Sequence, residues 1–404
     1  MAIAKFWSPF GFLALIPLGD WLGGAWTFLL IAALPIALAG GDWLLGAEPP
    51  AASDTAPIAH RLLPWLYIPL QLVEIVWAGW VIAQPSTDLV TAIGLTLSTG
   101  LAAGVFGFLA AHEMVHSRSQ AERNLGLAML TGVLYLPFAI AHVHGHHRRP
   151  ATRDDPATAR RGESLYAFWI RSVSGQAREA WTFEAQRLSR SGRSVFANRM
   201  LGYFAIEAAC VVLVGAMSGR ALAFLLAESA LSILLLESFN YVAHYGLARC
   251  RQADGRLEPL GPKHSWNSVR RMNNASLFNM GRHADHHRFS ARPYNELEVL
   301  DGGAQLPCGY AGVILMALIP PLWRRVMDPR VDAAMGDEAV SDPRAIGRAD
   351  AAAACLAGRR RPGSPNSRGR GRAARARRRR RNRPGNAQAK GPRELMNAGK
   401  NRRT

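Results

Sequence analysis

The sequence predicts an all-α integral membrane protein in which six helices form a transmembrane bundle. Long apolar runs with few charged residues recur up to Val242, and their lengths match the hydrocarbon core of a lipid bilayer. Short histidine-rich motifs follow several of these runs. We expect one membrane domain over residues 1–335 and a separate C-terminal segment over residues 336–404.

Six segments are apolar enough to be membrane-spanning helices, since about 20 helical residues cross the hydrocarbon core. The first segment is the shortest and contains Pro9 and Pro17. Because prolines interrupt it and a second apolar segment follows at once, it differs from a cleavable signal peptide, and we expect it to stay attached. The predicted spans are residues 6–20, 24–41, 63–83, 89–111, 200–217 and 221–242.

The distribution of basic residues predicts that the histidine motifs face the cytoplasm. With Lys5 on the cytoplasmic side, six crossings return the loops after Ala111 and Val242 to that side. The turns at residues 85–88 and 218–220 carry a single arginine, so the positive-inside rule supports this orientation. The arginines of the two loops include Arg118, Arg123, Arg148, Arg149, Arg153, Arg160, Arg161, Arg249 and Arg251.

Three further segments are not expected to cross the membrane. Residues 125–140 are apolar, and we expect a helix that enters or lies along the membrane surface; the alternative is a seventh span. Residues 148–199 are typical of a polar cytoplasmic helix, in which Glu184 and Arg187 are spaced to pair. Residues 311–323 are too short to cross and should pack on the core or the interface.

The strong positive charge belongs to the C-terminal segment. Of the net charge of +19, residues 359–404 supply 18 arginines or lysines against one glutamate, so the remainder carries only about +2. We expect this segment to be disordered. It is suited to anionic lipid headgroups or to nucleic acid, but a merely solvated tail, or an artefact of reading frame, explains it equally well. We therefore expect no nucleic-acid function for the membrane domain.

Ten of the twelve histidines fall in four motifs, HEMVH at residues 112–116, HVHGHH at 142–147, NYVAHYG at 240–246 and HADHH at 283–287, and all of these except His144 are candidate metal ligands. On a helix, residues three or four apart share one face, which is metal-ligand spacing. A single pair could simply snorkel at the interface, but four motifs at one depth favour metal binding, because ionisable groups near a membrane are costly without a function or partner. The nine are His112, His116, His142, His146, His147, His244, His283, His286 and His287.

The number of histidines predicts two metal ions rather than one. A zinc site uses about four ligands, so nine histidines exceed one such site. The HEMVH motif also matches the zinc-peptidase pattern with Glu113 as base, but that alternative leaves seven histidines unused. In a two-metal centre, Glu113 and Asp285 are candidates to accept the free ring N–H of a ligand, unless they are ordinary surface acids. A metal carrier without catalysis is the third alternative.

The histidines outside the nine are expected to have other roles. We expect His60 and His144 to be structural. His264 is a candidate to carry electrons or protons towards the centre, or is a surface histidine with satisfied hydrogen bonds. The four cysteines form no Cys-x-x-Cys pair, so no disulfide framework and no built-in rubredoxin or zinc ribbon is encoded.

From about Leu63 to Val331 the chain resembles the bacterial membrane-bound alkane 1-monooxygenases, within the wider family of membrane fatty-acid desaturases and hydroxylases. The resemblance rests on the ordered histidine motifs and on the shorter motifs between and after them, which are Ala151-Thr, Asp155-Pro-Ala, Gly162-Glu-Ser, Gln186-Arg-Leu-Ser-Arg190, His264-Ser-Trp-Asn-Ser268 and residues 323–329.

The resemblance implies a di-iron centre held by the nine histidines, O₂ as co-substrate, and hydroxylation of a hydrocarbon, with an alkane attacked at its terminal methyl. It also implies electrons from rubredoxin or ferredoxin with its reductase, as a separate protein, and contact with membrane lipid. Ala141 and Ala243 stand where the family usually has glutamate, and Ser117 where it usually has lysine. These departures favour, as alternatives, a hydroxylase of aromatic methyl groups such as those of xylene, or a fatty-acid desaturase or hydroxylase.

An alkane has no polar group, so we expect it to enter between helices and to bind through buried methylenes. Alternatively, the candidate side chains simply face lipid. The candidates are Ile93, Leu97, Leu101, Phe106 and Phe108.

Overall fold

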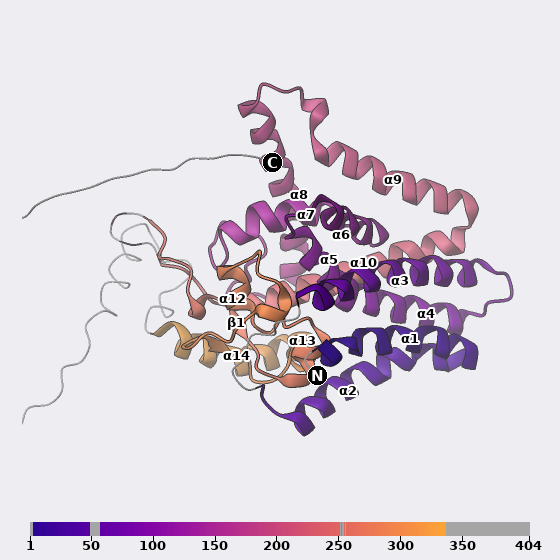
Figure 1. Cartoon of the computed structure of the whole chain (residues 1–404), viewed down its shortest axis with the longest axis horizontal. Helices are drawn as coiled ribbons and strands as arrows, with labels where there is room; N and C mark the ends of the chain where they lie inside the picture. Colours follow the sequence, from indigo (N-terminus) through magenta and orange to yellow (C-terminus); the bar gives the residue numbers. More distant parts are fainter. Residues whose placement is uncertain (1–2, 49–56, 251, 253, 255, 337–404) are drawn as a thin grey trace, which may run out of the picture. The chain divides into compact units, whose positions relative to one another are not determined.

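The computed structural model describes residues 3–48, 57–250, 252, 254 and 256–336, and these residues are mainly helical (Figure 1). The predicted C-terminal segment therefore lies outside the described residues, except for Gly336. The longer helices are α1 (Ser8–Leu22), α2 (Leu29–Leu45), α3 (Pro57–Ala83), α4 (Leu89–Ala102), α5 (Phe108–Val115), α6 (Gln120–Gly132), α8 (Leu165–Arg190), α9 (Arg199–Met217), α10 (Gly219–His244), α13 (Tyr310–Ala317) and α14 (Pro320–Met335).

Short elements connect these helices. Strands β1 (Trp266–Asn267) and β2 (Ala304–Gln305) pair in parallel, and two π-helical turns, η3 (Ala103–Gly107) and η4 (Ala141–Gly145), interrupt the helical chain. The remaining elements are η1 (Ile3–Trp7), η2 (Gly24–Phe28), α7 (Pro137–Ile140), η5 (His146–Arg148), η6 (Val195–Ala197), η7 (Pro262–His264), α11 (Arg271–Ser276), α12 (His283–Arg288) and η8 (Tyr294–Glu296).

Five helical segments within the described residues are long and apolar enough to cross a membrane, and they match the second to sixth predicted spans. They are Gly24–Leu45, Ala59–Ala83, Leu89–Val115, Arg199–Met217 and Gly219–His244. The first predicted span is not among them, because α1 has only 15 residues. At about 1.5 Å per residue, such a helix is shorter than the hydrocarbon core, which is about 30 Å thick.

The three segments expected not to cross agree with the structure. Residues 125–140 form most of α6 and α7, and α6 has 13 residues, too few for a span. Helix α8 covers much of the predicted polar segment, and within it Arg187 Nη2 lies 2.9 Å from Glu184 Oε2. Helices α13 and α14 pack on the core, where Val313 and Trp323 are fully buried.

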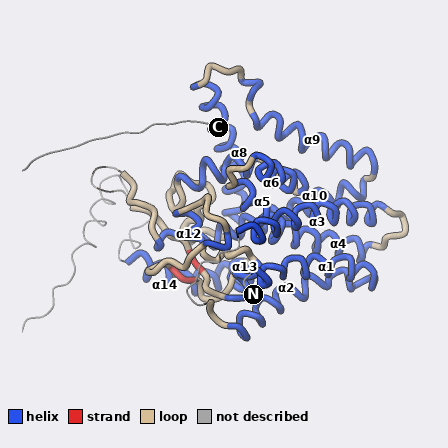
Figure 2. The backbone as a smooth tube through the Cα atoms, in the orientation of Figure 1, coloured by secondary structure: helices blue, strands red, loops and turns tan. Residues whose placement is uncertain are grey.

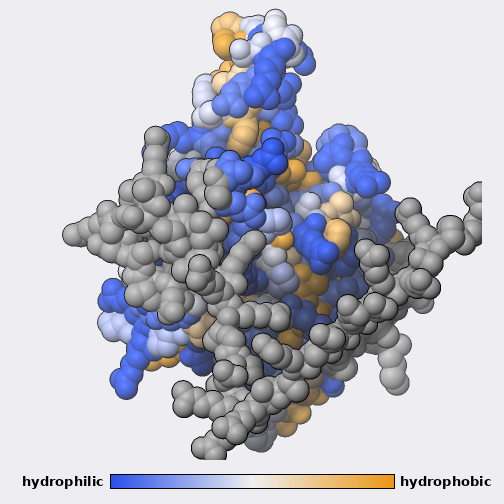
Figure 3. All heavy atoms as spheres, turned by 90° about the vertical axis from the view of Figure 1, so that its left-hand side faces the viewer, coloured by the Kyte–Doolittle hydropathy of each residue, from blue (hydrophilic) through white to orange (hydrophobic). Residues whose placement is uncertain are grey.

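The helices are arranged in hairpins with connections at opposite ends of the molecule. In Figure 1 the α3–α4 and α9–α10 connections lie at one end, while α12, β1 and α14 gather at the other. Figure 2 shows that most loop structure is also concentrated at that second end. Figure 3 looks onto this end, where the visible described residues are largely hydrophilic. The histidine motifs lie there, beyond the apolar helices.

Candidate metal centre

The structure brings all nine predicted histidines together in two neighbouring groups. The first group contains five residues and the second four, and within each group one ring nitrogen of every histidine lies within 4.8 Å of the others. Four chain segments far apart in sequence therefore meet at one place. The first group is His112, His116, His142, His147 and His286, and the second is His146, His244, His283 and His287.

Ring nitrogens of the second group are spaced like ligands around an ion. The Nε2 atoms of His244, His283 and His287 form a triangle with sides of 3.0, 3.1 and 3.2 Å. Imidazole nitrogens bind metals at about 2.1 Å, and two ligands at right angles around such an ion would be about 3.0 Å apart. The triangle therefore fits three adjacent ligand positions on one metal.

The first group has a similar spacing where its segments meet. His147 Nε2 lies 2.9 Å from His142 Nε2 and 3.1 Å from His286 Nε2. His112 lies in α5 and His116 caps the C-terminus of this helix, and their four-residue spacing puts both rings on one face. This group is thus assembled from α5, η4, η5 and α12.

A π-helical turn precedes one ligand-bearing segment and forms part of another. Turn η3 ends directly before α5, and η4 contains His142. One extra residue in a helical turn shifts the rotation of everything that follows, and such turns are frequent at functional sites. At η3 the helix also approaches α10 closely, since a Cβ atom on Gly104 would lie 2.7 Å from Ser232 Cα.

The lowered pKa values of the histidines suit metal binding. Burial lowers the pKa of His116 to about 3, and burial with the neighbouring histidines holds the pKa of His142, His147 and His286 well below the ordinary value. The rings are therefore neutral, as a ligand must be. Their arrangement also leaves His116 Nε2 and His146 Nε2 buried without a hydrogen-bond partner among the described residues, and a bound ion would satisfy them.

Asp155 fixes the orientation of His146. Its Oδ2 lies 2.7 Å from His146 Nδ1 and accepts a hydrogen bond from Thr158. Burial alone would raise the pKa of Asp155, but His146 and the Thr158 hydroxyl hold it below the ordinary value. Because a carboxylate only accepts, Nδ1 carries the proton and Nε2 presents its lone pair to the group.

A backbone carbonyl has the same role for His244. His244 Nδ1 lies 3.3 Å from the carbonyl oxygen of His264. His264 itself is 1% exposed, so the alternative of a surface histidine is wrong. Its Nδ1 accepts a hydrogen bond of 2.9 Å from Gly261 N, and its Nε2 lies 3.0 Å from Glu258 Oε1, which holds this loop against the centre.

The two carboxylates predicted to orient ligands contact other groups. Glu113 Oε1 accepts from Tyr294 N at 3.2 Å, and Asp285 Oδ2 accepts from Arg292 and from Glu298 N. Among the described residues neither is hydrogen-bonded to a ring of the nine histidines. Each is one residue from a ligand candidate on a helix, and a step of one residue rotates the side chain by about 100°. Asp155 occupies the position expected for them.

The remaining histidines lie outside both groups. His60 is buried against the rings of Phe6 and Tyr294, which agrees with a structural role. His144 lines a separate cavity with several arginines. Ala141, one of the departures noted above, packs in a small apolar cluster with Ala180 and Met200.

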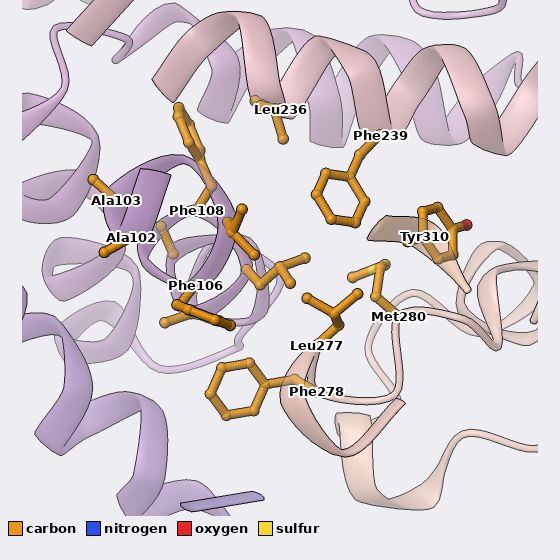
Figure 4. Packing of buried hydrophobic residues seen from close by; sticks show 14 of the residues in the cluster. Ala102, Ala103, Phe106, Phe108, Leu236, Phe239, Leu277, Phe278, Met280 and Tyr310 are labelled. Carbon is orange, nitrogen blue, oxygen red and sulfur yellow. The ribbon is translucent and has the colours of Figure 1, made fainter. Parts of the chain in front are cut away.

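Apolar side chains lead from the surface of the bundle to the second group. A cavity of about 190 Å³ is lined by Leu101, Leu235, Phe239 and Leu277 among others. Figure 4 shows Phe239 and Leu277 beside Met280, whose sulfur lies 3.3 Å from His283 Nδ1. The apolar lining thus extends to the histidines.

Of the candidate hydrocarbon-contacting residues, only Leu101 lines this cavity. Phe106 and Phe108 are fully buried in the adjoining core, whereas Ile93 and Leu97 are 44% and 38% exposed on the outer face of α4. For these last two, the alternative of a lipid-facing side chain is favoured, because the exposed surface of a membrane span contacts lipid.

The chain is similar to known proteins over most of its length. The fatty acid desaturase family model matches residues 86–301. The chain is 39% identical over 340 residues to alkane 1-monooxygenase 2 of Pseudomonas aeruginosa, covering 79% of this chain and 89% of that protein. It is 42% identical over 284 residues to alkane 1-monooxygenase of Ectopseudomonas oleovorans, covering 69% and 70%.

A lower identity links the chain to the alternative predicted from its departures. It is 30% identical over 314 residues to the xylene/toluene monooxygenase hydroxylase component of Pseudomonas putida, covering 76% of this chain and 82% of that protein. The resemblance predicted from the motifs is therefore confirmed, and the chain belongs to the alkane 1-monooxygenase family, within the fatty acid desaturase family.

Proposed function

We propose that the chain is a di-iron monooxygenase that hydroxylates an alkane at its terminal methyl. The observation that carries this proposal is the pair of imidazole groups, in which seven of the nine histidines are buried. The two groups lie beside an apolar cavity in a member of this family. In the balanced reaction, the alkane, O₂, two electrons and two protons give the alcohol and water. The identity of 42% with an alkane enzyme against 30% with the xylene/toluene hydroxylase favours an alkane substrate.

Each imidazole group is suited to hold one iron ion. The first group would supply five nitrogens and the second four, with His146 and His244 oriented by Asp155 and the His264 carbonyl. When bound, the two irons would activate O₂ for oxidation of a C–H bond. An all-nitrogen donor set also suits zinc or copper, so iron is inferred from the family rather than from the donors.

The rest of the site positions the hydrocarbon and excludes water. The cavity beside Leu101, Phe239 and Leu277 has almost no polar lining, so an alkane would bind there through burial of its methylenes, at about 0.8 kcal/mol each. Beyond the cavity, Met280 lies between this lining and His283. A terminal methyl is the part of a linear chain that can reach the histidines when the remainder lies in the cavity.

The chain is proposed to cross the bacterial inner membrane six times, with the histidines at the cytoplasmic face. The short η1 and α1 together contain 20 residues from Ile3 to Leu22, and this combined length is suited to a sixth crossing. The positive-inside distribution supports the orientation.

The electrons are proposed to come from a separate rubredoxin or ferredoxin with its reductase. A polar cavity of about 280 Å³ reaches His116 and is lined by Arg61, Arg118 and Arg292. Glu113 and Glu122 also line the cavity, so the three arginines leave a small excess of positive charge. This excess would suit an acidic carrier, since complementary charge speeds association.

Metal analysis combined with turnover tests this proposal. Purified protein should contain about two irons per chain and should consume O₂ with octane, a reductant and the electron carrier, forming 1-octanol. A single zinc without iron would overturn the di-iron proposal and favour the peptidase alternative with Glu113 as base. Faster hydroxylation of xylene than of octane would instead favour the aromatic alternative, whereas insertion of a double bond into a fatty acyl chain would favour a desaturase.

A further inference from the structure

We propose that a basic cavity at the junction of α8 and α9 binds the phosphate headgroup of an anionic phospholipid. The cavity has a volume of about 370 Å³, and none of the nine candidate ligand histidines lines it. Its lining includes Arg148, Phe183, Glu184, Arg187, Arg190 and Arg199.

The cavity carries an excess of positive charge. Four arginines line it against one carboxylate. Glu184 pairs with Arg187 at 2.9 Å and with Arg199 at 2.6 Å, so both of these guanidinium groups are held in place by the same acid. Among the residues that the structure describes, Arg148 and Arg190 have no carboxylate partner. Since guanidinium groups bind phosphate oxygens with paired hydrogen bonds, the unpaired arginines point to a phosphate ligand.

The position of the cavity matches the depth of lipid headgroups. Arg199 is the first residue of α9, a candidate membrane span, so the cavity lies where the chain enters the bilayer. Directly before it, Val195 and Phe196 are 70% and 87% exposed, as expected for side chains that insert into the interface. In Figure 1, α8 runs across the direction of α3 and α4, whereas α9 runs back along it.

Helix α9 offers a surface for the acyl chains of the same lipid. Only 6% of its apolar window is buried within the protein, and Leu201, Phe204, Val212 and Leu213 are exposed along it. A lipid whose phosphate occupies the cavity would extend its chains along this helix. This combination of a basic cavity and an adjoining apolar helix favours a phospholipid over a free phosphate ion or an acidic protein.

The bound lipid would stabilise η5, the segment that carries two candidate metal ligands. Arg148 is the last residue of η5, which also contains His146 and His147, while Arg190 and Arg199 belong to α8 and α9. A phosphate shared by these arginines would link the ligand segment to the two helices. We therefore expect the lipid to raise the stability of the folded protein as well as to bind.

Lipid binding to the purified, metal-loaded full chain tests the proposal without turnover. The probes are phosphatidylglycerol, phosphatidylcholine of the same chain length, and inorganic phosphate, with bound lipid counted by native mass spectrometry. Each basic group near a membrane surface contributes roughly a fivefold change in affinity. We expect R190Q to weaken phosphatidylglycerol binding about fivefold and R148Q combined with R190Q about 25-fold. The matched control is R178Q, because Arg178 is an exposed residue of α8 outside the cavity.

Preferential binding of phosphatidylglycerol, lost in the cavity variants and retained in R178Q, would support the proposal. Equal binding of the two lipids, or equal loss in R178Q, would overturn it. Displacement of the lipid by inorganic phosphate at equal concentration would assign the cavity to a soluble phosphate instead. If R190Q leaves lipid binding intact but lowers the hydroxylation rate with an acidic electron carrier, the cavity is a protein-docking site and the lipid proposal fails.

Discussion

His286 and His287 are neighbours in sequence, yet they belong to different histidine groups. Their ring centroids are 5.7 Å apart, with His286 beside His147 and His287 beside His244 and His283. The division follows from helix geometry, since consecutive side chains of α12 point about 100° apart. One short helix therefore supplies ligands to both groups and sets the distance between them.

Replacing Asp155 by Asn should weaken metal binding in the second group. The amide is neutral and no longer stabilises the proton on His146 Nδ1, and loss of such a partner typically costs about 10–100-fold in metal affinity. Metal content after dialysis against graded chelator measures the effect. The control is Asp154→Asn, because Asp154 is exposed. Equal retention of metal in both variants would show that Asp155 does not orient the ligand.

Replacing Gly104 by Ala should destabilise the fold near the centre. The added Cβ would lie 2.7 Å from the Ser232 backbone, and overpacking of this kind costs about 1–3 kcal/mol. Thermal unfolding in detergent measures the loss. Gly202→Ala in α9 is the control, since a Cβ there meets nothing within 4 Å and Ala favours helix. A variant of Gly104 as stable as the Gly202 variant would contradict the close approach of η3 and α10.

Glu184→Gln should remove a pH-dependent part of the stability. Burial would raise the pKa of Glu184, but hydrogen bonds from Arg199 and Arg187 lower it from 4.5 to about 2. The folded state therefore favours the carboxylate, and its contribution is complete above about pH 4.5 and disappears as the pH falls to about 2.

Unfolding midpoints across this pH range measure the contribution of Glu184. The difference between wild type and E184Q should shrink as the pH falls, whereas Glu298→Gln, a change at a 60% exposed side chain, should leave the profile unchanged. A constant difference at every pH would mean that Glu184 stabilises the fold without using its charge.

Leu235→Phe should shift the substrate preference towards shorter alkanes. Leu235 lines the apolar cavity, and a larger ring would displace part of a bound chain. Loss of two buried methylenes would weaken binding about 15-fold. Competition between octane and dodecane measures the preference, with Leu226→Phe as the control at a 48% exposed position of the same helix. An unchanged ratio in the Leu235 variant would exclude this cavity as the binding site.

The sequence predicted five of the six spans and the nine histidines that meet, because both depend on local patterns. Hydropathy located the five long helices, and four-residue spacing placed His112 and His116 on one face. It did not predict which histidines share a group, since that depends on how distant segments meet. The sequence also predicted that Glu113 and Asp285 orient ligands, because each is adjacent in sequence to a ligand candidate. On a helix, however, adjacent side chains point about 100° apart.

Asp155 and the His264 carbonyl were missed for the same physical reason. Asp155 is nine residues from His146 and His264 is twenty from His244, and both lie in segments without a regular period. Only the folded chain brings them to the ring nitrogens. The Asp155-Pro-Ala and His264-Ser-Trp-Asn-Ser268 motifs were the signals available in the sequence, and neither indicated a hydrogen-bond partner.

The two histidine groups consist entirely of neutral donors, and this has an electrochemical consequence. Two divalent ions bound there would keep most of their positive charge, because no carboxylate belongs to either group among the described residues. The apolar surroundings would screen that charge weakly. Gaining electrons would then be favourable and losing them costly, so a redox-active metal bound here would have a higher reduction potential than the same metal at a site with carboxylate ligands.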